Sequence, residues 1–202
     1  MNTYNSNIHN RRSIRLKGYD YSRAGLYFIT ICCQDKICRF GHIENGAMIL
    51  NEYGEIAYNE WVKLIDRFPN FELNIFQIMP NHMHAIINLV GAPLAGAPID
   101  TGAPDYTGTQ NDTGAQNDMN IGNGMRTGAS PVPTVGDIVG AYKSLVANGC
   151  LKIYKNNNET MGKLWQRNYY EHIIRDERSY KRICEYIINN PIKWTDDKLY
   201  QL

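Results

Sequence analysis

Apolar and polar positions alternate along this chain with two different periods, and the shorter period predicts strands. Runs rich in β-branched and aromatic residues, bounded by turn residues, are typical of buried strands. Pro80 separates two such runs, which are expected to pair as antiparallel neighbours. Asn45-Gly46, within residues 39–50, favours the tight turn of a β-hairpin. The predicted strands cover residues 26–32, 74–79, 82–90 and part of 165–174.

The longer period, near 3.6 residues, predicts three helices. They cover residues 51–67, a segment that starts after Thr134, and residues 176–190. Thr134 with Asp137 three residues later is a capping-box signal. Pro191 ends the last helix, because the residue before a proline disfavours the α region. Strands interspersed with helices and a hairpin predict an α+β fold, a small antiparallel sheet with helices packed on one face.

Residues 91–134 differ in composition from the rest of the chain. They hold eight of the 17 glycines and five of the eight prolines, and an imperfect Gly-Ala-Pro motif recurs in them. Such a segment buries too little apolar surface to offset the entropy lost on ordering, which predicts a disordered, low-complexity insertion loop. The expected organisation is one domain over residues 1–202, built from residues 1–90 and 135–202.

The composition narrows the class of protein. Hydrophobic residues make up 43% and charged residues 20%, as in ordinary globular proteins. No run of 18 or more apolar residues occurs and the first ten residues are polar, so neither a membrane span nor a secretory signal is expected. The five cysteines form no CxxC pair, which argues against a zinc site or a disulfide framework. A cytoplasmic protein is therefore expected.

The net charge is only +1, but both ends of the chain are basic. Residues 1–40 carry seven Lys and Arg against two Asp and Glu, and residues 135–202 are also basic, whereas the middle of the chain is acidic. Basic clusters neutralise phosphates, but they are common on any solvated surface. This pattern alone is weak evidence for nucleic-acid binding.

The sharpest chemical signal is His82-Met83-His84, at the start of a predicted strand. Side chains at positions i and i+2 of a strand point to the same face, so the two imidazoles lie side by side while Met83 and Ala85 face the other way. Two neutral imidazoles can share one divalent cation when a distant element supplies a third ligand. Ordinary buried or surface histidines are the alternative.

The last predicted helix offers a nucleophile and a third ligand. Tyr186 and Asn190 are four residues apart, so they are neighbours on one face, and Arg182 joins the same row. By helical geometry this row flanks the apolar stripe of the helix. The alternative is an ordinary half-buried tyrosine, since the chain has 14 of them.

Four motifs occur along the chain in this order: Pro80-Asn81-His82-Met83-His84, Leu164-Trp165-Gln166-Arg167, Glu171-His172-Ile173-Ile174-Arg175-Asp176 and Tyr186-Ile187-Ile188-Asn189-Asn190-Pro191. Together they resemble the motifs of the HUH single-tyrosine transposases, especially the REP-associated tyrosine transposases and their insertion-sequence relatives. The resemblance covers nearly the whole chain except its first ten residues and the insertion. The long insertion and the lack of a glycine soon after Pro191 depart from the family pattern.

The resemblance implies a ferredoxin-like antiparallel sheet that carries the two histidines on a central strand. It implies that His82, His84 and Asn190 bind Mg²⁺ or Mn²⁺ and that Tyr186 is the catalytic nucleophile. The implied enzyme is a metal-dependent endonuclease and strand transferase that acts on single-stranded or hairpin DNA through a 5′-phosphotyrosine intermediate, in DNA transposition or repeat mobilisation. It gives no role for His172, which lies in one of the motifs.

Single strands are held by basic grooves and by stacking on aromatic side chains, which makes cations and aromatics candidate DNA contacts. The candidates are Arg11, Arg12, Arg15, Lys17, Lys143, Trp165, Arg167, Arg175 and Arg182, with Tyr169 as a further stacking residue. The expected location is the cytoplasm, in association with the bacterial nucleoid, with monomer and homodimer both open. The main alternative is a non-cleaving hairpin-DNA-binding module derived from such a transposase, and another is a replication or plasmid-transfer nickase.

Overall fold

The computed structural model describes residues 18–90 and 132–200. In chain order its strands and helices are β1 (Gly25–Cys32), β2 (Gly41–Glu44), β3 (Ala47–Leu50), α1 (Glu52–Val62), β4 (Phe71–Met79), β5 (His82–Leu89), α2 (Val135–Asn156), β6 (Tyr170–Ile174) and α3 (Glu177–Asn189). Short 3₁₀ turns occur at Gln34–Lys36, Lys63–Asp66 and Trp194–Asp196. The predicted insertion loop, 91–134, lies outside the described residues except for 132–134.

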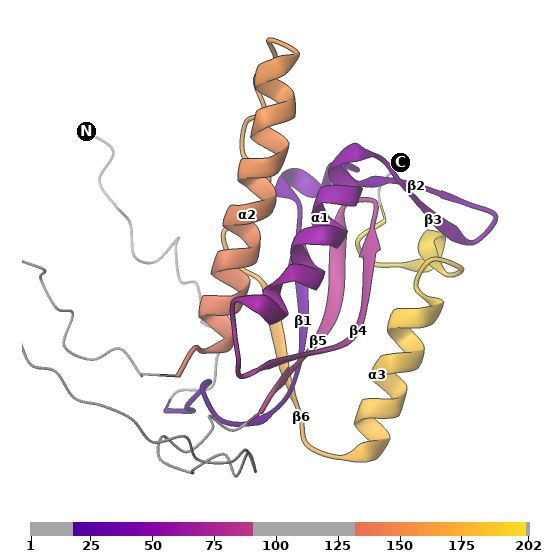
Figure 1. Cartoon of the computed structure of the whole chain (residues 1–202). Coiled ribbons are helices and arrows are strands. Elements are labelled where there is room, and N and C mark those ends of the chain that lie inside the picture. The colour runs from indigo at the N-terminus through magenta and orange to yellow at the C-terminus, as the bar shows by residue number, and fades with distance from the viewer. Residues whose placement is uncertain (1–17, 91–131, 201–202) are drawn as a thin grey trace, which may run out of the picture.

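Four strands form one antiparallel sheet in the order β4-β5-β1-β6 (Figure 1). Phe28 of β1 lies opposite Ile86 of β5 on one side and opposite His172 of β6 on the other. Without the β2–β3 hairpin and α3, the order β1-α1-β4-β5-α2-β6 is the βαββαβ arrangement of a ferredoxin-like fold. The predicted ferredoxin-like α+β class is therefore confirmed, and the histidine-bearing strand β5 is central.

Helices cover both faces of this sheet, which corrects the prediction that they pack on one face. α1 and α2 cover the face on which Ile29 and Ile31 of β1 lie, and these residues belong to the larger hydrophobic core. α3 covers the opposite face, where Ile187 packs in a second core with Phe28 and Ile86. Figure 1 shows α3 across the sheet from α1 and α2. Because β1 and β5 carry apolar side chains on both faces, removing both faces from water requires a helix on each side.

The first face is closed by α2, which begins at the predicted capping box. The Thr134 side chain accepts a hydrogen bond from the Asp137 N–H at 3.3 Å, and the Asp137 carboxylate accepts one from the Thr134 N–H at 2.9 Å. Further along, the ring of Tyr142 packs edge-on against Trp61 of α1, with centroids 5.1 Å apart. Within the two described ranges, no helix is both long and apolar enough to cross a membrane.

The second face is closed by α3, whose ends follow local chemistry. The Asp176 carboxylate caps its first turn by accepting the Ser179 N–H at 2.8 Å. The helix runs to Asn189 and stops before Pro191, as predicted. Its apolar stripe is buried, so the row that holds Tyr186 lies at the margin of the contact with the sheet. This margin is where α3 approaches β5.

The contact between α3 and the sheet can be tested with two adjacent isoleucines. Ile187→Ala should destabilise the protein by about 2–4 kcal/mol, because a fully buried side chain is removed from the second core. Ile188→Ala is the control, since Ile188 lies on the same helix turn but is 59% exposed. Urea unfolding followed by circular dichroism measures both, and equal losses would contradict the placement of α3.

Candidate functional site

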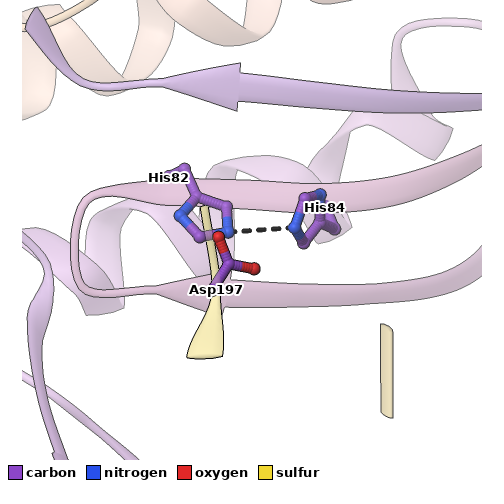
Figure 2. Close-up of side chains that lie close together, drawn as sticks. All are labelled: His82, His84 and Asp197. Carbon is purple, nitrogen blue, oxygen red and sulfur yellow. Dashed lines mark hydrogen bonds between the residues drawn. The ribbon is translucent and has the colours of Figure 1, made fainter. Parts of the chain in front are cut away.

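The paired histidines lie in the interior, between the sheet and the C-terminal part of the chain. His82 and His84 are 0% and 2% exposed, and their Nε2 atoms are 3.0 Å apart (Figure 2). Both point to the α3 face of β5, whereas Met83 and Ala85 belong to the core under α1 and α2. The strand alternation read from the sequence thus gives the observed side-by-side arrangement.

Each imidazole is oriented by a hydrogen bond at Nδ1, the ring nitrogen that does not face the other histidine. The Asn81 amide nitrogen donates to two backbone carbonyls, so its oxygen faces His82 and accepts a hydrogen bond from Nδ1–H at 2.8 Å. In neutral His82 the Nε2 lone pair is then free to face the site. His84 Nδ1 lies 2.8 Å from the Thr30 hydroxyl, which can donate or accept. His84 can therefore turn either an N–H or a lone pair toward His82 without losing its hydrogen bond to Thr30.

Burial keeps both imidazoles neutral over the physiological range. It lowers the pKa of His82 to about 4, although the nearby Asp197 carboxylate acts in the opposite direction. It lowers the pKa of His84 well below 6.5, with a further contribution from the neighbouring His82. Metal ligation requires unprotonated imidazole nitrogens. Near pH 7 this pair is in the form that a cation would need.

Tyr186 reaches the histidine pair from α3. Its hydroxyl oxygen lies 3.1 Å from His84 Nε2, and its ring centroid is 5.0 Å from that of His84. The side chain is 45% exposed, so one side of the phenol faces the histidines and the other is open to solvent. Burial, and then the negative charge of Asp197, raise the pKa of Tyr186 above its ordinary value. The structure therefore brings together two residues that lie 102 positions apart in the sequence, with the phenol in its protonated form at neutral pH.

Asp197 is a member of this site that sequence reasoning missed. Its Oδ2 accepts a hydrogen bond from the Tyr186 hydroxyl at 3.1 Å and another from Asn190 Nδ2 at 2.8 Å. Burial opposes ionisation of this carboxyl, but hydrogen bonds from Asn190 and the Leu199 N–H outweigh burial and lower its pKa. One ligand atom from each of His82, His84 and Asp197 lies within 4.8 Å of the others (Figure 2). Two imidazole nitrogens and a carboxylate oxygen are a suitable donor set for a divalent cation.

Asn190, the predicted third ligand, is hydrogen-bonded to Asp197. It follows the last residue of α3 and is 2% exposed. Its Nδ2 donates to Asp197, while its Oδ1 is buried without a hydrogen-bond partner among the described residues. A buried carbonyl oxygen without a partner is costly, so an oxygen-binding cation at this position fits the residues present. The side chain can act as a ligand itself or hold the carboxylate in place.

Contacts with Asn81 and His82 hold the segment that carries Asp197 next to the start of β5. Asn81 Nδ2 donates to the Leu199 carbonyl at 2.8 Å. The ring of Trp194 packs against His82 on one side and Tyr200 on the other, with centroids 5.8 Å and 5.3 Å apart. These contacts explain how a residue outside every strand and helix reaches the histidine pair. No motif or periodicity marks it in the sequence.

The candidate DNA contacts fall into different environments. Arg182 lines an open hollow beside Tyr186, together with Lys193, which the sequence analysis did not single out. Arg167 and Arg175 are exposed, and Arg175 lies at another hollow along β6. Arg11, Arg12, Arg15 and Lys17 lie outside the described residues.

Two of the predicted DNA contacts make structural contacts within the chain. Lys143 Nζ donates to the backbone carbonyls of Gln166 and Arg167 at 2.6 Å and 3.1 Å. Trp165 is only 9% exposed, belongs to the core under α1 and α2, and donates its Nε1–H to the Lys143 carbonyl at 3.0 Å. A buried indole leaves no free ring face for a base, so Trp165 cannot stack as predicted.

No family model matches the chain, but comparison with known proteins finds similar sequences and structures. An uncharacterised protein of Haemophilus influenzae is 41% identical over 197 residues, covering 98% of this chain and 97% of the relative. A second Haemophilus influenzae protein, provisionally named a REP-associated tyrosine transposase, is 22% identical over 175 residues, covering 86% of this chain and 74% of that protein.

The chain is also similar to solved structures, one of which shows the same fold. A REP-associated tyrosine transposase bound to a REP hairpin matches 92% of this chain and 77% of its own, with a TM-score of 0.50 and 17% identity. A protein from Deinococcus radiodurans, provisionally named a transposase, matches 88% of this chain and 97% of its own, with a TM-score of 0.44 and 14% identity. At such identities the first of these matches establishes the fold alone.

The buried histidines make the stability of the metal-free protein depend on pH. The pKa of His82 is about 4 when folded and near 6.5 when unfolded, so between these values the unfolded chain binds more protons. Stability should therefore fall as pH drops from 7 to 4.5, by roughly 2–3 kcal/mol from His82. Urea unfolding in EDTA at both pH values measures it. His82→Gln should reduce the loss, and the exposed His42→Gln should not; equal losses in all three proteins would contradict burial of neutral His82.

Proposed function

This chain belongs to one family with the uncharacterised Haemophilus influenzae protein. We propose that it is a member of the wider group of REP-associated tyrosine transposases and that it cuts and rejoins single-stranded hairpin DNA. The reaction would be a metal-dependent strand transfer through a 5′-phosphotyrosine intermediate, carried out by one catalytic domain over residues 1–202. The observation that supports it most is the position of the Tyr186 hydroxyl, 3.1 Å from both His84 Nε2 and Asp197 Oδ2.

His82 and His84 would hold Mg²⁺ or Mn²⁺ through their Nε2 atoms, and an oxygen of Asp197 or Asn190 would complete the set. A set of two imidazole nitrogens and one carboxylate is softer than the all-oxygen sets that Mg²⁺ prefers, so Mn²⁺ is at least as suitable. When bound, the cation would supply Lewis-acid stabilisation of the charge that builds up on the scissile phosphate.

The residues of this chain would provide the nucleophile and the proton acceptor. The Tyr186 oxygen would attack phosphorus and form a tyrosine–phosphate bond, while the bond between phosphorus and the 3′-oxygen breaks. The phenolic proton would pass to Asp197 Oδ2, which already accepts its hydrogen bond, and then to the departing 3′-oxygen. The phosphotyrosine conserves the bond energy, so attack by another 3′-hydroxyl reverses the step and joins a new strand.

Exposed cations beside Tyr186 would hold the strand on either side of the scissile phosphate. Arg182 and Lys193 line the same open hollow as Tyr186, and they would contact neighbouring phosphates. Histidines, tyrosine and carboxylate all come from one chain. A monomer would therefore be able to carry out the proposed reaction without exchanging α3 in a homodimer.

The nucleophile can be tested by trapping the covalent intermediate. The full chain, incubated with Mg²⁺ or Mn²⁺ and single-stranded hairpins copied from the DNA that flanks its own gene, should form an adduct resistant to denaturing gel electrophoresis. Tyr186→Phe and EDTA should each abolish the adduct, because one removes the attacking oxygen and the other the cation. Tyr58→Phe, at a tyrosine of similar exposure on α1, should leave it unchanged. Binding without an adduct would instead favour the non-cleaving hairpin-binding module.

The third ligand can be identified by comparing two alanine variants. Asp197→Ala should weaken Mn²⁺ binding more than about 10–100-fold, the loss that is usual when a residue that only hydrogen-bonds to a metal ligand is replaced. Asn190→Ala should fall within that range, because it would act by holding Asp197. Asp196→Ala, next to Asp197 but exposed, is the control. Calorimetric titration with Mn²⁺ measures all three, and a larger loss in Asn190→Ala would make Asn190 the ligand, as the sequence resemblance implied.

A further inference from the structure

An exposed aromatic surface extends from the site to the edge of the sheet. β6 is an edge strand, and its burial alternates, with Tyr170 and His172 exposed and Glu171 buried between them. Tyr170 lies opposite Thr30 of β1, and Thr30 faces His84. Tyr170 and His172 therefore stand on the α3 face of the sheet, the same face as the paired histidines.

Phe28 connects Tyr170 to the reactive centre through direct ring contacts. Its ring stacks on His84 with centroids 5.5 Å apart. It meets Tyr186 edge-on at 6.2 Å and Tyr170 edge-on at 6.1 Å. Tyr170 is thus separated from the proposed nucleophile by a single intervening ring. A nucleotide next to one whose phosphate lies at Tyr186 would be within reach of this surface.

The Tyr170 side chain is open to solvent on this surface. It is 50% exposed, and its hydroxyl makes no hydrogen bond within residues 18–90 and 132–200. α3 covers Ile174 at the other end of β6 but not Tyr170. The neighbouring Tyr169, expected from the sequence to stack on DNA, points to the opposite face and donates its hydroxyl to Glu171 at 2.8 Å. Because adjacent residues of an extended chain point to opposite faces, Tyr169 faces the larger core and Tyr170 faces the site.

We propose that Tyr170 is a stacking platform for one unpaired nucleobase next to the scissile phosphate, an inference that rests on the proposed function. Unpaired bases stack on exposed aromatic side chains of sheets, whereas bases inside a duplex already have both faces covered. Arg175 and His172 line the hollow beside Tyr170 and supply the cationic and polar groups that a sugar–phosphate backbone needs. Asp176 on the same rim is engaged in capping α3 through Ser179. The occupant is therefore the single-stranded flank of a hairpin, not its stem.

The test compares binding of two DNA probes by variants of the full chain. One probe is a hairpin with an unpaired flank copied from the DNA beside its gene, and the other is the same hairpin without the flank. Tyr170→Ala should bind the flanked probe about 5- to 150-fold more weakly, the usual effect of losing one base–aromatic stack. It should bind the blunt hairpin as the parent does. Tyr170→Phe should restore tight binding, because the ring face is retained.

A fluorescent base shows where the contact lies and separates this inference from the proposed reaction. With 2-aminopurine at each unpaired position in turn, the parent should quench one position, and Tyr170→Ala should not. The inference is overturned if Tyr170→Ala binds the flanked probe as tightly as the parent, or if the parent binds neither probe. If the Tyr170 effect is present but no covalent adduct forms, the proposed cleavage fails and the base-binding site stands.

Discussion

The alternation of side chains along β5 is the constraint on which the site depends. Met83, Ala85 and Ile87 are buried under α1 and α2, which fixes His82 and His84 on the other face. Because β5 is paired on both sides, a shift of one residue would expose the apolar set and bury the histidines in the wrong core. The larger core therefore specifies the position of the histidines, although neither histidine belongs to it. α3 must then lie on the second face, or Tyr186 could not reach them.

Polar groups buried in this way must find partners, and here they largely find one another. Asn81 orients His82, Thr30 meets His84, and Asp197 accepts from Tyr186 and Asn190. The two Nε2 atoms face one another at 3.0 Å, and the Asn190 carbonyl oxygen has no hydrogen-bond partner among the described residues. Inward-facing lone pairs on buried atoms are what a cation site requires, and they are unfavourable elsewhere in a protein interior.

Local patterns in the sequence were sufficient for much of this structure, and long-range ones were not. Strand period placed both histidines on one face, and the cap at Asp176 and Pro191 bounded α3. The face on which α3 packs depends on the whole sheet, whose second apolar face was not recognised. Asp197 lies in a segment without periodicity, held by distant backbone contacts. Tyr169, a stacking candidate from the sequence, lies on the face of the sheet opposite the paired histidines. Because β6 is short, only its pairing with β1 fixes which side faces the site.

Under the proposed function, the charges at the site favour a bound cation. Neutral imidazoles contribute no charge, and ionised Asp197 contributes one negative charge beside Tyr186. A phosphodiester brought to the phenol adds a second negative charge, and repulsion between the two in a partly buried site is strong. A divalent cation would cancel both charges and also lower the pKa of Tyr186, which burial and Asp197 raise. Arg182 and Lys193 line the open hollow beside Tyr186, where solvent screens them more, so in the proposed reaction they would guide the strand better than they would replace that cation.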